Sequence, residues 1–139
     1  MDKKKKQFFE EQIKIKQNFD GLEIDMVTLA KQLGYETHSM KEAPQEIMAG
    51  IIKSDKTILV NLDYNMEILR FCIAYFLAKD YLDKLENAEV YTCLQLPDKE
   101  AYELTKKLLV SKNIKPNEMD IEERIQKAKK LKIPFSTLL

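Results

Sequence analysis

Histidine and cysteine are scarce in this 139-residue chain, which has one histidine and two cysteines. His38 follows a short predicted strand and has no partner nearby in sequence, so we expect a surface or otherwise hydrogen-bonded side chain. Cys72 and Cys93 both lie in apolar surroundings. Two thiols are too few for a disulfide framework, and we expect them to be buried and reduced. A Cys–His catalytic pair would require the fold to bring them together.

Net charge is also absent, because 23 Lys and Arg balance 23 Asp and Glu. A dedicated nucleic-acid binder needs a basic excess, so we expect no direct nucleic-acid binding. The run Lys3–Lys6 has no interleaved aromatic residue, which favours a solvated tail over contact with nucleic acid or acidic lipid. The longest apolar run, Phe71–Ala78, is too short to span a bilayer, and no apolar signal core follows the N-terminus. We therefore predict a cytoplasmic protein without a membrane partner.

The pattern of apolar residues predicts one α+β domain over residues 1–139, a small antiparallel sheet packed on a helical bundle. Residues 1–7 are predicted to be a flexible leader, and 113–139 a C-terminal helical extension. Strands are predicted at 35–38, 47–53 and 57–62, the last two forming a hairpin. From Ile68 to Ala78 only Arg70 is polar, which predicts a helix covered on most sides. The predicted helices are 8–19, 25–33, 67–82, 86–94, 98–111 and 121–131.

Two neighbouring segments carry a family resemblance. Residues 58–61 read Ile-Leu-Val-Asn, and residues 70–79 read Arg-Phe-Cys-Ile-Ala-Tyr-Phe-Leu-Ala-Lys. They resemble the strand and the catalytic helix, Arg-Phe-x-Ile-Ala-His-Glu-Leu-x-His, of the ImmA/IrrE zinc metallopeptidases. The segments 24–34, 49–50 and 94–97 are similar to further elements of that family. The resemblance covers about residues 8–98 and implies a zincin-like minimal metallopeptidase fold.

The residues that perform the family's chemistry are replaced. Tyr75 stands at the first His of the family motif, Phe76 at the Glu and Lys79 at the second His. In an active member the two imidazoles ligate zinc and the Glu acts as general base. A neutral phenol is a poor zinc ligand, Phe76 accepts no proton, and a charged Lys79 offers no lone pair. The resemblance therefore implies a catalytically inactive relative with neither metal nor cofactor.

The family's third, acidic zinc ligand corresponds to Glu86, counted back from residues 94–97, with Glu89 one helical turn further. We expect the Lys79 ammonium to replace the metal by pairing with Glu86, and Tyr75 to donate a further hydrogen bond. The alternative is a Lys79 that points to water, in which case the pair contributes little.

Two other arrangements remain open at this point. Cys72, Cys93 and Glu86 could form a rebuilt metal site, although two structural thiols are favoured. A second group of side chains could line a ligand pocket, although filling the core around the central helix is favoured. This aromatic group consists of Phe71, Tyr75, Phe76 and Tyr81.

The function implied by the resemblance is that of a regulatory protein from a phage or mobile element, binding a protein or peptide such as a helix-turn-helix repressor. We expect the partner to add as a strand along an exposed sheet edge over the former cleft. The alternatives are a hydrolase with an unrecognised or rebuilt site, and a structural subunit. The predicted edge consists of Thr57, Ile58, Leu59, Val60 and Asn61.

Overall fold

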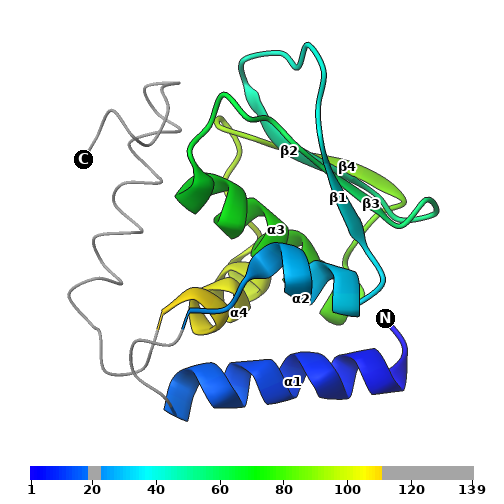
Figure 1. Cartoon of the computed structure of the whole chain (residues 1–139), viewed down its shortest axis with the longest axis vertical. Helices are drawn as coiled ribbons and strands as arrows, with labels where there is room; N and C mark the ends of the chain where they lie inside the picture. The colour runs from blue at the N-terminus through cyan, green and yellow to red at the C-terminus, as the bar shows by residue number, and fades with distance from the viewer. Residues whose placement is uncertain (19–22, 111–139) are drawn as a thin grey trace.

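A four-stranded sheet forms one layer of the protein, and its helices lie on one side of that sheet (Figure 1). The computed structural model describes residues 1–18 and 23–110. Helices α2, α3 and α4 form the layer next to the sheet, and α1 crosses beneath α2 and α4. The elements are α1 (Lys3–Asn18), α2 (Met26–Gln32), β1 (Glu36–Ser39), β2 (Ile47–Ile52), β3 (Thr57–Val60), α3 (Met66–Tyr81), β4 (Ala88–Thr92) and α4 (Lys99–Leu109).

The sheet has the strand order β1-β3-β2-β4. β2 and β3 form the predicted antiparallel hairpin, and β4 adds antiparallel to the other side of β2. β1 pairs with β3 in parallel, with Thr37 opposite Ile58. The α+β class with a small sheet is thus confirmed, but the expectation of a purely antiparallel sheet is wrong. β1 enters from α2 and runs alongside β3 in the same direction, so the sheet is mixed.

The prediction of a helix over residues 86–94 is wrong, because this segment contains strand β4. Its sequence, Ala-Glu-Val-Tyr-Thr, places Tyr91 in the core and leaves Val90 exposed. A segment of this length has no decisive period, and the neighbouring strand decides its conformation. β2 is buried along most of its length, and β4 satisfies the backbone groups on its second edge.

The prediction of a flexible leader over residues 1–7 is also wrong, because α1 begins at Lys3. Lysine is a good helix former, and the Asp2 carboxylate accepts the Lys5 N–H at 2.9 Å. Further along α1, Phe9 is fully buried and stacks on Tyr81 with ring centroids 4.8 Å apart. The predicted helix 121–131 and the extension 113–139 lie outside the described residues.

Helix α3 is the centre of the fold, as predicted from its nearly continuous apolar sequence. Asn65 caps its N-terminus by accepting the Ile68 N–H at 3.0 Å. α3 lies against β2 on one side and between α2 and α4 on the others. Asp25 caps α2 in the same way, because its carboxylate accepts the N–H groups of Val27 and Thr28. The chain leaves α2 through Gly34, whose φ of 96° suits glycine.

Candidate functional site

A buried tyrosine stands at the position that the resemblance assigns to a zinc-binding histidine. Tyr75 packs on Tyr91 with ring centroids 4.8 Å apart, and its hydroxyl accepts the Asp98 N–H at 2.7 Å. Burial raises the pKa of Tyr75, while the Asp98 N–H and the nearby Lys79 ammonium act in the opposite direction. A neutral phenol that joins α3 to the start of α4 therefore occupies the place of a metal ligand. Tyr75 accepts this hydrogen bond, whereas we had expected it to donate one.

Lys79 forms an ion pair across the interface between α3 and the sheet. Its ammonium lies 2.5 Å from Glu89 Oε1 on β4, and each side chain is only 15% exposed. The second oxygen of Glu89 accepts the Glu86 N–H at 2.7 Å. Lys79 also lies over the Tyr75 ring, 5.9 Å from its centroid. A cation thus sits where the resemblance places a metal, but it is partnered by Glu89.

Two predicted site features are corrected by the sheet. Glu86 lies before β4 rather than on a helix and is exposed, so the expected Lys79–Glu86 pair is not formed. The supposed edge strand, Thr57–Asn61, lies inside the sheet, because β3 pairs with both β1 and β2. β1 and β4 are the edges instead. Partner addition along β3 is therefore excluded by its own neighbours.

The two cysteines are buried, and they are not joined in a disulfide. Cys93 follows the end of β4, whereas Glu86 precedes its start, and a strand extends by about 3.3 Å per residue. The alternative of a rebuilt metal site from Cys72, Cys93 and Glu86 is therefore not assembled, and the two thiols are buried as expected. Within residues 1–18 and 23–110, no three His, Cys, Asp or Glu side chains are grouped to hold a metal ion.

The remaining sequence candidates have structural roles. His38 is exposed on β1 and lies 3.2 Å from the Glu36 carboxylate, as expected of a surface histidine. Three members of the aromatic group are buried around α3, and the fourth, Tyr81, packs on α1. The prediction that this group fills the core is confirmed. It consists of Phe71, Tyr75, Phe76 and Tyr81.

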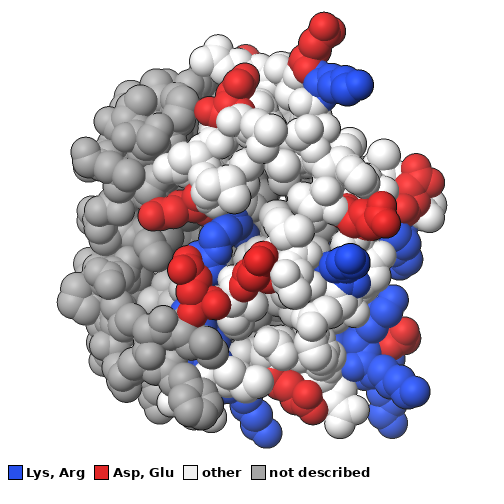
Figure 2. All heavy atoms as spheres, viewed as in Figure 1, with Lys and Arg blue, Asp and Glu red and all other residues white. Residues whose placement is uncertain are grey.

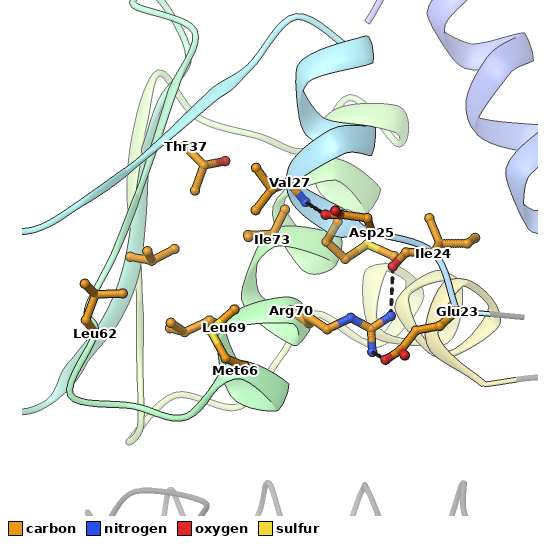
Figure 3. A pocket seen from close by; sticks show the side chains of 12 residues that line it. Glu23, Ile24, Asp25, Val27, Thr37, Leu62, Met66, Leu69, Arg70 and Ile73 are labelled. Carbon is orange, nitrogen blue, oxygen red and sulfur yellow. Dashed lines mark hydrogen bonds and ion pairs between the residues drawn. The ribbon is translucent and has the colours of Figure 1, made fainter.

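An open pocket lies on the other side of α3, between α2 and the ends of β1 and β3 (Figure 3). We call it the α2–α3 pocket; its volume is about 500 Å³. At its rim Leu62 and Met66 are 65% and 66% exposed, and Val27 is nearly half exposed. The lining residues are Glu23, Ile24, Asp25, Met26, Val27, Thr37, Val60, Leu62, Met66, Leu69, Arg70 and Ile73.

The polar groups of this pocket are few. Arg70 crosses one end, where its guanidinium lies 3.1 Å from the Glu23 carboxylate and donates to the Ile24 carbonyl at 2.9 Å. Lys16 of α1 is buried near them, and burial lowers its pKa. Across the pocket from Val27, the buried Thr37 hydroxyl has no hydrogen-bond partner among the described residues. The wall of the pocket is therefore largely apolar, and it contains one buried hydroxyl whose hydrogen bond is not made within the described fold.

Acidic side chains surround the mouth of the pocket. Figure 2 shows acidic side chains gathered about a basic one in the middle of the face that it presents. Two exposed acids line the pocket, and two more adjoin the rim residues Leu62 and Met66 in sequence. Arg70 is balanced by Glu23 in an ion pair, so the other three acids leave the mouth with an acidic excess. The four acids are Glu23, Asp25, Asp63 and Glu67.

Only a weak signal for this pocket is present in the sequence. Val27 is an apolar residue that lies off the buried face of α2, and Leu62 and Met66 flank the polar turn before α3. Exposed apolar residues are ordinary when scattered singly. Their meaning depends on being brought together from α2, the end of β3 and the start of α3, which local patterns do not reveal.

Comparison with known proteins provides no relatives: no family model matches the chain, and neither a curated protein nor a solved structure is significantly similar to it. None of the helices within the described ranges combines the length and the apolar character needed to cross a bilayer.

Proposed function

We propose that this chain is a non-catalytic binding protein, which holds an apolar segment of a protein or peptide in the α2–α3 pocket. The observation that carries the proposal is the pocket itself, where three exposed apolar side chains surround a hollow of about 500 Å³. Hollows of this size are typical of ligand sites. The positions that would perform chemistry in the resembled family, Tyr75 and Lys79, are filled and internally paired.

The chemistry of the pocket indicates the kind of segment that it binds. Leu62, Met66 and Val27 favour apolar side chains, and covering them removes apolar surface from water. The unpartnered Thr37 hydroxyl favours a segment with one polar group at that depth. Because the mouth is acidic, basic residues beside the apolar ones add attraction.

The resemblance to the ImmA/IrrE family supports a more specific proposal. A relative without the zinc ligands would act in a phage or mobile element by binding a regulatory protein, with a helix-turn-helix repressor as one possible partner. Its partner would be held by the pocket rather than by a strand edge over the former metal site.

Selection from a library of displayed random peptides tests the proposal. The wild-type chain is the target, and the variant Leu62→Lys with Met66→Lys is the counter-target, because it replaces the apolar rim with charge. Leu94→Lys with Leu96→Lys is the matched control, since it changes two exposed leucines outside the pocket. We expect peptides rich in apolar and basic residues that bind the wild type and the control but not the rim variant. Peptides that bind all three proteins equally would refute the pocket as the binding site.

A further inference from the structure

The α2–α3 pocket lies within reach of the chain that follows Val110, the last described residue. Gln17 near the end of α1 donates to the Val110 carbonyl at 3.0 Å, so Val110 lies beside α1. From Gln17 the chain continues to Glu23, which lines the pocket, and six residues span at most about 22 Å. Residues 111–120 reach at most about 36 Å when extended. The chain after residue 120 is therefore long enough to reach the pocket from Val110.

The sequence after residue 120 has the properties that the pocket favours. Ile121, Ile125, Ala128 and Leu131 are spaced by 4, 3 and 3 residues, which places them along one side of the predicted helix 121–131. A helix of this length extends about 16 Å. Such a stripe of apolar side chains is the form in which amphipathic helices enter apolar grooves.

The charges of this segment complement those of the pocket. Residues 121–131 carry four basic side chains against two acidic ones. On the predicted helix, Lys127 and Lys129 lie on either side of the apolar stripe. The mouth of the pocket has the opposite sign, because Asp25, Asp63 and Glu67 are exposed there while Arg70 and Glu23 balance each other in an ion pair. The basic residues of the segment are Arg124, Lys127, Lys129 and Lys130.

We propose that residues 121–131 of the same chain dock in the α2–α3 pocket as an amphipathic helix and compete there with the external partner. This inference rests on the proposed function, because it treats the pocket as a binding site. Docking covers the exposed Leu62 and Met66 and sets the basic side chains against the acidic mouth. The segment then acts as a built-in competitor: only the fraction of molecules with an undocked segment binds the partner.

Cleavage of the full-length protein by a glutamate-specific protease tests the docking, because Glu122 and Glu123 lie within the segment. When the segment undocks and redocks faster than the protease cuts, the cleavage rate is proportional to the fraction of molecules with an undocked segment. If nine tenths of the molecules are docked, an undocked variant is cleaved there about tenfold faster. We expect this increase for Leu62→Lys with Met66→Lys and, independently, for Ile125→Lys, which leaves the described fold unchanged. The control Leu94→Lys with Leu96→Lys should match the wild type.

Equal cleavage of the wild type and both variants would overturn the docking. Measuring the cleavage rate at several protein concentrations shows whether the protected segment docks in its own chain or in a second copy. Protection by the chain's own segment is independent of concentration, whereas protection by a second copy disappears on dilution and would overturn docking within one chain. Mass spectrometry of the first fragments assigns the cleavage to Glu122 or Glu123.

Affinity measurements separate this inference from the proposed function. A peptide selected for the pocket should bind the full-length Ile125→Lys variant about tenfold more tightly than the wild type. Equal affinity together with equal cleavage would reject the docked segment while the binding function stands. The opposite outcome is that Glu122 is protected from the protease in the wild type, but no peptide binds through the pocket, even in the Ile125→Lys variant. That outcome would reject the proposed function while the docking stands.

Discussion

The two sides of α3 differ in what occupies the space beside them. On one side Tyr75 and Lys79 contact α4 and β4 directly, and each makes a hydrogen bond or an ion pair within the fold. On the other side Leu69 and Ile73 face a hollow whose rim residues remain exposed. One helix thus has a side closed by internal partners and a side open to a ligand. Sequence similarity to a catalytic helix draws attention to the closed side, while the space for binding lies on the open side.

The largest difference between the two sides should appear when side chains are removed. Phe71 packs against Tyr75 and Tyr91 on the closed side and is 2% exposed, so Phe71→Ala leaves a cavity that should lower the free energy of unfolding by about 3–5 kcal/mol. Met66→Ala on the open side should change it by less than about 0.5 kcal/mol. Urea denaturation of both variants measures the contrast. Comparable losses would mean that the open side is as tightly packed as the closed one.

The Lys79–Glu89 pair provides the second test of the closed side. Lys79→Met or Glu89→Gln alone should lower the free energy of unfolding by about 1–3 kcal/mol, because the partner group is left buried without its bond. The double variant should lose less than the sum of the two, since no unpaired charge remains. The exposed pair Lys6–Asp83 is the control, and it should show no measurable coupling. Additive effects at Lys79 and Glu89 would show that this pair does not close the interface.

Asp98 connects the closed side to α4 and introduces a pH dependence. The Ala101 N–H is the main cause that lowers the pKa of Asp98, with Lys84 contributing and burial acting in the opposite direction. The folded pKa lies below the ordinary value of 3.8, so the stabilisation is complete above that value and is lost as the pH falls through the folded pKa. Asp98→Ala should therefore cost about 1 kcal/mol at neutral pH and progressively less in acid.

Two variants sharpen this measurement. Asp98→Asn keeps a capping oxygen without the charge, so its difference from the wild type isolates the contribution that depends on pH. Asp25→Ala removes the matching cap of α2 on the open side and should also cost about 1 kcal/mol at neutral pH. Thermal unfolding at a series of pH values distinguishes the variants Asp98→Ala, Asp98→Asn and Asp25→Ala. A constant cost of Asp98→Ala at every pH would contradict the role of its carboxylate charge.

Zinc should have the smallest effect of all. Tyr75, Phe76 and Lys79 supply no imidazole, and the described residues hold no alternative group of ligands. We expect the midpoint of thermal unfolding to be the same with zinc and with a chelator, and elemental analysis to find no stoichiometric metal. About one zinc per chain after dialysis would show that the closed side retains a metal site.

Helix positions and their caps could be predicted from the sequence, because the signals are local. Asp25, Asn65 or its neighbour Asp63, and Gly34 mark the ends of helices through hydrogen bonds and backbone angles within a few residues. The hairpin of β2 and β3 is local as well. The central position of α3 followed from the composition of a single segment, since a helix that is apolar on all sides must be covered.

The sheet neighbours and the site depended on contacts that are distant in sequence. β4 is a strand because β2 has a second edge to satisfy, and the short segment from Ala88 to Thr92 does not decide this alone. The parallel pairing of β1 with β3 likewise changed which strands are edges. As a result Lys79 meets Glu89 where Glu86 was expected. The α2–α3 pocket combines residues from four elements and the segments between them, which no single stretch of sequence reveals.

The parallel pairing of β1 also has a consequence for the order of folding. The β2–β3 hairpin closes over a four-residue connection between Ile52 and Thr57 and can form early. β1 has only four residues and must wait until the hairpin is in place, because β3 is its only neighbour among the strands of the described residues. We therefore expect the amide of His38, which faces β3, to exchange with solvent faster than those of the hairpin. Thr37 lies on this strand, so one wall of the pocket belongs to the part of the sheet that forms last and opens first.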